Sequence, residues 1–188
     1  MKNKNKYEIV IHGRGGQGAK TTAEILVQAA ICKGKFVQAF PNFGPERTGA
    51  PMRAFVRISN KPIRTREPVI DPDCVLVLDE TIANVIDVTK NVTGTEALII
   101  NSQKPKDELK KKLKFEGNII PVDASGMSLE VIGEDRPNTV ILGKFAFVTD
   151  IVKIDDIISV FRAKYEKKVG KEKTDKNIKA IEMAFRLY

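Results

Sequence analysis

The 188-residue sequence predicts an α/β fold with an open, mainly parallel β-sheet. Strand-like runs alternate with amphipathic helical patterns, and several runs are apolar without alternation, as in parallel strands covered on both faces. A glycine-rich turn joins the first strand to the first helix, which is typical of Rossmann-like sheets. We therefore expect helices on both faces of the sheet, helices at the C-terminal end, and a single domain over residues 1–188.

The N-terminal elements are predicted to be a strand, a turn and a helix. The strand covers Tyr7–Ile11 and the helix covers Ala19–Lys33, where apolar residues recur at three- and four-residue spacing. A second strand, Phe36–Phe40, follows the helix. This order indicates two adjacent parallel strands joined by a right-handed crossover.

The rest of the chain continues the alternation. Further strands are expected over Met52–Ile58, Cys74–Leu78, Ala97–Ile100 and Ile119–Val122. Helices are expected over Asp107–Phe115, within Arg136–Val148, over Asp155–Glu166, and from a capping Thr174 to the C-terminus. A charged linker, Lys167–Lys173, precedes the last helix, whose apolar stripe must dock on this domain or on a partner.

The composition excludes several classes of function. No apolar run approaches the length that spans a membrane, and the N-terminal residues do not resemble a signal peptide, so we expect a soluble cytoplasmic protein. The net charge of +8 lies largely in lysine-rich segments, which are expected to be solvated surface. Because neither aromatic stacking residues nor a nucleic-acid-binding module accompany them, we expect no nucleic-acid partner.

The few cysteine and histidine residues argue against metal and nucleophilic chemistry. Cys32 and Cys74 lie in apolar surroundings at no CxxC spacing, and both are expected to be buried free thiols. The single histidine, His12, is expected at the edge of the core rather than in a catalytic triad. We expect neither a metal site nor an iron–sulfur cluster on this chain.

The most informative stretch is the glycine-rich turn. Four glycines, Gly13, Gly15, Gly16 and Gly18, allow positive φ angles and close approach of a ligand to the backbone. The following helix offers unpaired N–H groups and a positive dipole end, so the turn is suited to bind an anion. The spacing also matches a dinucleotide fingerprint, but the acid expected after the second strand is missing. An NAD(P)-binding domain is therefore disfavoured.

A second distinctive stretch runs from Pro41 to Pro51. Its three prolines and two glycines predict a stiff loop that is neither strand nor helix. The adjacent Glu46 and Arg47 suggest recognition of a polar group, although a solvated ion pair on a surface turn is the alternative. We expect this loop and the glycine turn to leave the carboxyl ends of adjacent strands, where such sheets place their sites.

Taken together, these motifs resemble those of the gamma subunits of 2-oxoacid:ferredoxin oxidoreductases, particularly of pyruvate synthase. The likeness extends over most of the chain, in the same order. It includes Arg57–Ser59 with Lys61–Ile63, Pro72 and Asp73 before the strand Val75–Asp79, and Pro137–Gly143.

The resemblance implies a subunit of an anaerobic, heterotetrameric enzyme with alpha, beta and delta partners. Such an enzyme converts a 2-oxoacid and coenzyme A to acyl-CoA and carbon dioxide, with ferredoxin as the electron acceptor. In the family, thiamine diphosphate and iron–sulfur clusters are held by partner subunits. This chain lacks a thiamine motif and cluster-binding cysteines, so we expect no catalytic residue on this chain alone.

The resemblance also implies where coenzyme A acts. The expected cofactor-binding residues are Gly13, Arg14, Gly15, Gly16, Gln17, Gly18, Ala19 and Lys20, whose N–H groups and basic side chains would meet phosphate or a partner subunit. The residues expected to face the active site or an interface are Phe43, Gly44, Pro45, Glu46, Arg47, Thr48 and Gly49.

Several alternatives stay open at this point. The glycine turn could serve only tight strand–helix packing, and the chain could be a pure assembly module without a ligand site. Within the family, the substrate could be 2-oxoisovalerate or 2-oxoglutarate. The segment Thr48–Pro51 resembles the pyruvate and branched-chain members more closely than the 2-oxoglutarate group.

Overall fold

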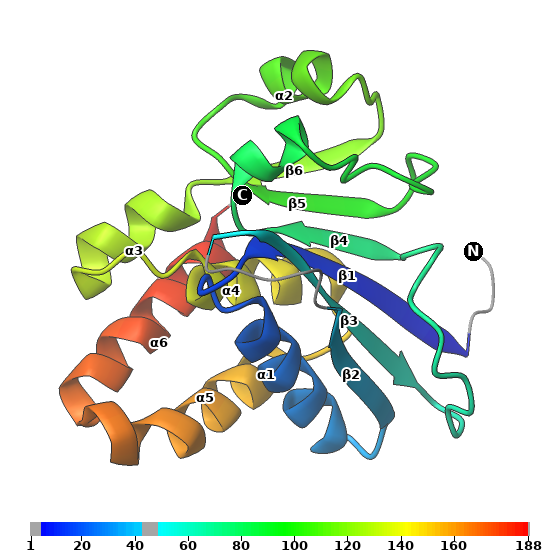
Figure 1. Ribbon diagram of the computed structural model, residues 1–188. Coiled ribbons are helices and arrows are strands. Elements are labelled where there is room, and N and C mark those ends of the chain that lie inside the picture. Colours follow the sequence, from blue (N-terminus) through cyan, green and yellow to red (C-terminus); the bar gives the residue numbers. More distant parts are fainter. Residues whose placement is uncertain (1–4, 43–48, 188) are drawn as a thin grey trace.

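The computed structural model describes residues 5–42 and 49–187, which form a six-stranded sheet flanked by helices (Figure 1). The strands are β1 (Lys6–Arg14), β2 (Phe36–Asn42), β3 (Pro51–Ser59), β4 (Cys74–Val77), β5 (Ala97–Asn101) and β6 (Asn118–Val122). The helices are α1 (Ala19–Ile31), the short 3₁₀ helix η1 (Glu80–Asn84), α2 (Lys106–Leu113), α3 (Ala124–Ile132), α4 (Pro137–Thr149), α5 (Ile154–Val169) and α6 (Lys171–Arg186). The predicted α/β class with a mainly parallel sheet is confirmed.

The strand order is β2-β3-β1-β4-β5-β6, which corrects one prediction. We expected the first two strands to be neighbours, but β3 lies between them and runs antiparallel to both. The pairs β1–β4, β4–β5 and β5–β6 are parallel. In the sequence of β3, small or aliphatic residues alternate with Arg53, Phe55 and Arg57, which suits an antiparallel strand. Such a local pattern does not say between which strands β3 is inserted.

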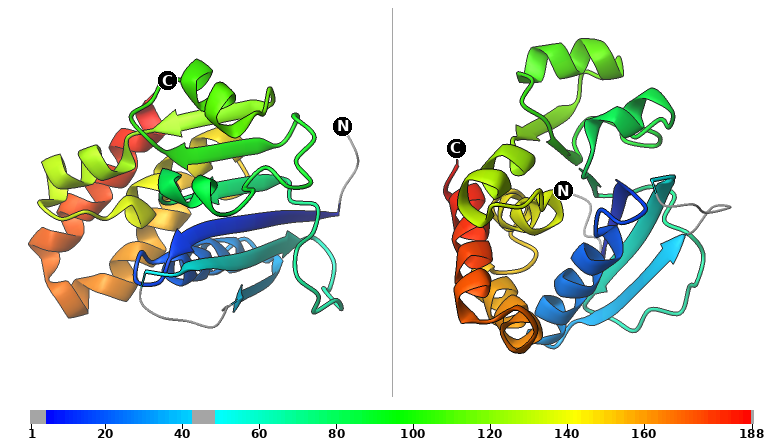
Figure 2. Two further views of the ribbon diagram at one scale, coloured as in Figure 1. Left: turned by 45° about the horizontal axis from the view of Figure 1, so that its top comes forward. Right: turned by 60° about the vertical axis from the view of Figure 1, so that its left-hand side comes forward.

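Helices cover both faces of the sheet, as predicted (Figure 2). On one face, α1 and α4 pack against the strands, while α5 and α6 pack on these helices. The larger apolar core lies at this interface and includes Ile9, Ile11, Leu76 and Ile99 from the strands. On the other face, η1 and α2 bury a second cluster around Val77 and Leu98.

The C-terminal helices depart from the prediction in two ways. The expected linker Lys167–Lys173 is absent, because α5 continues to Val169 and only Gly170 separates it from α6. Thr174 lies inside α6 and does not cap it; its hydroxyl donates to the Gly170 carbonyl at 2.8 Å. The apolar stripe of α6 docks on this same chain, where Ile178 and Ile181 are buried.

Three smaller predictions are also corrected. Pro41 belongs to β2 and Pro51 begins β3, which is possible because β2 is an edge strand and a strand can start with proline. Cys74 is buried, but Cys32 is exposed because it follows the last residue of α1 and lies off its apolar face. Helix α3 was not predicted; Asp123 caps it by accepting from the Gly126 N–H at 2.8 Å.

Among the described residues, no helix has the length and apolar character needed to cross a membrane.

The contact between α4 and α6 requires a glycine. A Cβ atom added at Gly143 would lie 1.9 Å from the Ile181 carbonyl oxygen. We expect Gly143→Ala to lower the free energy of unfolding by about 1–3 kcal/mol or more, because one helix must move away from the other. Urea denaturation measures this change. The control Ser159→Ala, at an exposed position of α5, should change the stability by less than about 0.5 kcal/mol. Equal stability of both variants would contradict this account of the helix contact.

Candidate functional site

The glycine turn connects the end of β1 to the start of α1. Gly16 and Gly18 have φ angles of 96° and 83°, in the left-handed region that favours glycine. The Gln17 N–H donates to the Arg14 carbonyl at 3.0 Å, and the Gln17 side-chain oxygen accepts from the Arg14 N–H at 2.7 Å. The turn is therefore closed by one hydrogen bond between backbone groups and by a second one to the Gln17 side chain.

The glycines of the turn differ in their surroundings. A Cβ atom at Gly18 would lie 2.6 Å from the Asn138 side-chain nitrogen, and one at Gly13 would lie 3.2 Å from a Leu78 methyl group. Gly18 therefore allows the turn to pack closely against α4, and Gly13 allows β1 to lie close to Leu78, which follows β4. At Gly16, by contrast, a Cβ atom would meet no described atom within 4 Å. Gly16 thus presents an open stretch of backbone.

The Arg14 side chain fastens the turn to two other segments. Its Nε donates to Asp79 Oδ2 at 2.9 Å, its Nη2 to Thr81 Oγ1 at 2.8 Å, and its Nη1 to the Gly49 carbonyl at 3.1 Å. Gln17 Nε2 donates to the same Asp79 oxygen at 3.1 Å. We call these five residues the Arg14 clamp. Within it, the three nitrogens of the Arg14 guanidinium all donate to acceptors of this chain.

Asp79 is the anionic centre of the Arg14 clamp. It also caps η1 by accepting from the Thr81 N–H at 2.8 Å. Partial burial raises the pKa of the Asp79 carboxyl, but the hydrogen bonds from Thr81, Gln17 and Arg14 outweigh this effect and lower its pKa below the ordinary value. The carboxylate is therefore ionised at neutral pH and holds the clamp together.

The two predicted loops meet at one edge of the sheet. The Gly15 N–H donates to the Ala50 carbonyl at 2.9 Å, and the Gly49 N–H donates to the Gly15 carbonyl at 3.2 Å. Gly49 is thus brought to the glycine turn. The other predicted loop residues, Phe43, Gly44, Pro45, Glu46, Arg47 and Thr48, lie outside the described residues. Lys20 is exposed near the start of α1, with its Nζ 3.8 Å from Glu24 Oε1.

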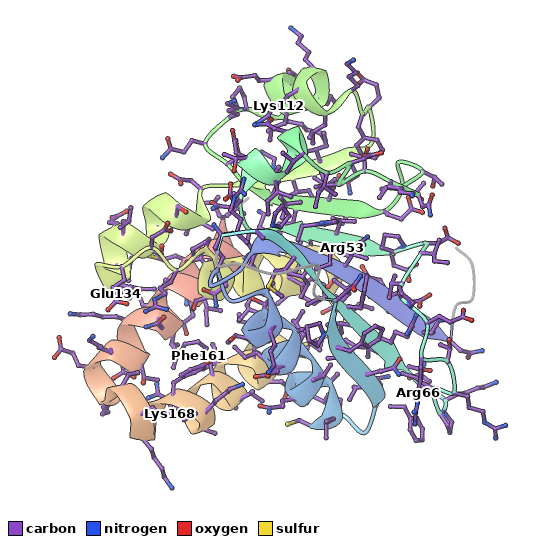
Figure 3. All side chains as sticks on the ribbon, viewed as in Figure 1. Arg53, Arg66, Lys112, Glu134, Phe161 and Lys168 are labelled. Carbon is purple, nitrogen blue, oxygen red and sulfur yellow. The ribbon has the colours of Figure 1, made fainter. Side chains whose placement is uncertain are left out.

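A cavity of about 380 Å³ opens beside the glycine turn. Its lining comes from the turn, from the end of α3 and from α1, α4, α5 and α6, and includes Gly16, Gly18, Thr21, Ile132, Glu134, Arg136, Asn138, Phe161, Tyr165, Lys173 and Asn177. Figure 3 shows Glu134 and Phe161 on the side of the molecule where α3, α5 and α6 lie. The sequence alone does not indicate that these helix residues lie beside the turn; its one signal is the motif Pro137–Gly143.

The lining of this cavity carries more positive than negative charge. Arg136 Nη2 and Lys173 Nζ lie 2.7 Å and 3.3 Å from the two oxygens of one carboxylate, Glu134. Hydrogen bonds from Arg136 and then Lys173 hold the pKa of Glu134 below its usual value. One carboxylate shared by two cations leaves an excess positive charge next to the open backbone of Gly16. This arrangement can bind an anion whose body contacts an aromatic wall.

His12 lies at the edge of the core, as predicted, and is 5% exposed. Burial, with a smaller effect of the nearby Arg53 guanidinium, lowers its pKa to about 4. The described part of the chain contains no group of three or more His, Cys, Asp or Glu residues that could hold a metal ion.

The sequence profile of the family described as pyruvate ferredoxin/flavodoxin oxidoreductase matches residues 8–187. The chain belongs to this family. The resemblance inferred from the glycine turn, the proline-rich loop and the Pro137–Gly143 motif is therefore confirmed.

Named relatives cover nearly the whole chain. It is 45% identical over 179 residues to the pyruvate/ketoisovalerate oxidoreductases common subunit gamma of Thermococcus kodakarensis, with 95% of both chains covered. It is 44% identical over 181 residues to pyruvate synthase subunit PorC of Methanothermobacter thermautotrophicus, with 95% of this chain and 93% of the other covered. The solved structure of pyruvate oxidoreductase subunit PORC from Thermotoga maritima matches with a TM-score of 0.86 at 38% identity, over 97% of this chain and 96% of that one.

The Arg14 clamp makes a prediction about stability. Arg14→Gln removes a guanidinium with three hydrogen-bonding partners and leaves the Asp79 carboxylate less well compensated, so we expect a loss of about 1–3 kcal/mol in the free energy of unfolding. Urea denaturation at neutral pH measures it. Lys20→Gln is the matched control, because its ion pair is long and exposed, and it should cost less than about 0.5 kcal/mol.

The same clamp predicts a dependence on pH. Because folding lowers the pKa of Asp79, its stabilising effect is complete above the ordinary value of 3.8 and is lost as the pH falls through the folded-state value. Asp79→Asn should therefore reduce the stability at neutral pH and flatten the decline of stability in acid. Denaturation curves recorded from neutral pH to below 3.8 test this; an unchanged acid slope would argue against it.

Proposed function

We propose that this chain is the gamma subunit of a pyruvate:ferredoxin oxidoreductase, that is, of a pyruvate synthase complex. The observation that carries the proposal is the similarity over 95% of both chains to relatives that bear the name of a gamma subunit. The complex would convert pyruvate and coenzyme A to acetyl-CoA and carbon dioxide while reducing ferredoxin. Residues 1–188 would form one domain of this subunit, with alpha, beta and delta subunits as partners.

The gamma subunit would contribute its glycine turn to the coenzyme A region of the assembled enzyme. Three features support this: the open backbone at Gly16, the positive end of α1, and the excess positive charge of Arg136 and Lys173 around Glu134. Coenzyme A is strongly anionic through its phosphates, and its adenine ring suits an aromatic wall such as Tyr165.

The predicted site residues take different roles in this proposal. Gly16 and Ala19 would offer backbone N–H groups to phosphate, and Lys20 would offer its ammonium group. The N–H groups of Gly15 and Gln17, which donate to the Ala50 and Arg14 carbonyls, would hold the turn in shape. Gly13 and Gly18 would provide the close packing that shapes the turn. Arg14 would position the turn through the clamp rather than contact the ligand.

The remaining chemistry would belong to partner subunits. Thiamine diphosphate and the iron–sulfur clusters would be held there, and no catalytic residue would come from this chain alone. The loop from Phe43 to Gly49 would face the active site or a contact between subunits. The hydrogen bonds that hold Gly49 and Ala50 beside the turn support this proposal.

2-Oxoisovalerate is a second candidate substrate, because one relative is named as a subunit common to pyruvate and ketoisovalerate oxidoreductases. The same gamma chain would then serve two enzymes that differ in their other subunits. Purification of the chain with its native partners under anaerobic conditions, followed by assays with pyruvate, 2-oxoisovalerate and 2-oxoglutarate, separates these possibilities. Purification without any partner subunit would contradict the proposed function.

The coenzyme A site makes a kinetic prediction for the assembled enzyme. Lys173→Gln and Arg136→Gln should each raise the KM for coenzyme A by about fivefold to tenfold, because each removes one charge-assisted contact with phosphate. The KM for pyruvate should stay unchanged. Lys179→Gln, at an exposed position of the same helix as Lys173, is the matched control. Unchanged KM values for coenzyme A in both variants would exclude this cavity as its site.

A further inference from the structure

A second and larger cavity, of about 730 Å³, lies on the opposite face of the sheet from α1. Its floor is formed by Val10 of β1, Val75 of β4 and Val69, which are all buried. His12 lines the same cavity, since it alternates with the core residue Ile11 and shares a face with Val10. The volume falls in the range of small-molecule sites.

The His12 imidazole is the unusual group in this cavity. Its side chain is nine-tenths or more buried, yet Nδ1 has no hydrogen-bond partner in the described part of the chain. Neutral imidazole carries one donor and one acceptor nitrogen, and buried polar atoms in folded proteins are nearly always hydrogen-bonded. The neighbouring charged groups are Arg53, which faces His12 across the β1–β3 pair, and Asp87.

Two cations, Arg53 and Lys90, line the cavity, and both are exposed. Neither forms an ion pair with a carboxylate in the part of the chain that the structure describes. The Arg53 guanidinium lies 5.8 Å from the centre of the Phe55 ring, and Figure 3 shows Arg53 over the central strands. Asp87, the carboxylate that the described residues contribute to this lining, accepts from both the N–H and the hydroxyl of Thr89, at 2.9 Å and 2.6 Å.

Hydrogen bonds hold the walls of this cavity in place. The Asn91 side chain donates to the Ile70 carbonyl at 3.1 Å, which joins the two segments that form its rim. The buried Arg57 side chain donates to the Glu67 carbonyl at 2.6 Å and to Glu8 Oε1 at 2.7 Å. The segment before β4 is thereby tied to β1 and β3 by hydrogen bonds within the chain.

We propose that this cavity binds a small organic anion with an apolar body, of the short-chain carboxylate class. The carboxylate lies between Arg53 and Lys90, the apolar body packs on the valines of the floor, and the His12 imidazole forms a hydrogen bond with the ligand. The ligand class follows from these residues alone and does not depend on the proposed function.

The single histidine makes a direct test possible, because the imidazole resonances of the chain come from His12 alone. The full chain, labelled with ¹⁵N-histidine in a buffer without carboxylates, is titrated with butyrate and followed by NMR. Butyramide, a neutral ligand of the same shape, and acetate, which lacks most of the apolar body, are the matched ligands. We expect a saturable shift with butyrate, weaker binding of acetate, and no saturable response to butyramide.

Variants test the two cations separately. Arg53→Gln and Lys90→Gln should each weaken butyrate binding by about fivefold, and Lys179→Gln, an exposed lysine on the helical side, should leave it unchanged. Because all three positions are exposed, the urea denaturation midpoint of each variant without ligand should stay close to that of the parent chain and shows that the fold is intact. Binding is read as the shift from each variant's own unliganded His12 resonance. A butyrate shift that does not saturate, equal responses to butyrate and butyramide, or equal weakening by all three variants would overturn the proposal.

Discussion

The ion pair between Arg14 and Asp79 is the contact on which the arrangement of the glycine turn depends. Arg14 ends β1, Asp79 follows β4, and these strands are parallel neighbours, so the two side chains meet at the same edge of the sheet. The same guanidinium reaches the Gly49 carbonyl just before β3. One side chain thus joins the ends of three segments, and the turn is held in its conformation before any ligand arrives. Such preorganisation lowers the entropic cost of binding.

The insertion of β3 between β1 and β2 shapes both cavities. It brings Ala50 against the glycine turn and places Arg53 opposite His12. It also buries Arg57, whose guanidinium contacts Glu8 and the segment before β4. The sheet therefore separates two surfaces with different chemistry. On the α1 side, an open backbone turn lies near two cations that share one carboxylate, and on the other side a neutral imidazole lies near two cations above an apolar floor.

The two interpretations of the glycine turn, as a packing device and as an anion site, apply to different residues. Gly18 is required by its positive φ angle and by sterics, because a Cβ atom there would lie 2.6 Å from the Asn138 side-chain nitrogen. At Gly13 a Cβ atom would make a tight contact with Leu78. Gly16 has a positive φ angle with no described atom near its missing side chain. The space beside Gly16 is thus open to a ligand, while Gly13 and Gly18 allow β1 and α1 to pack closely against their neighbours.

The sequence by itself determined the α/β class, most strands and helices, and the two motifs at the sheet edge, because apolar periodicity and turn chemistry are local properties. It did not determine that β3 separates β1 from β2, because strand neighbours are chosen by contacts between distant residues. Nor did it reveal that α5 runs through Lys167 and Lys168, since charged residues are as compatible with an exposed helix face as with a linker. Only the tertiary structure brought Lys173 and Arg136 to the glycine turn: Thr22, near the start of α1, donates to the carbonyl of Asn138, 116 residues away, and no local pattern encodes a contact at that separation.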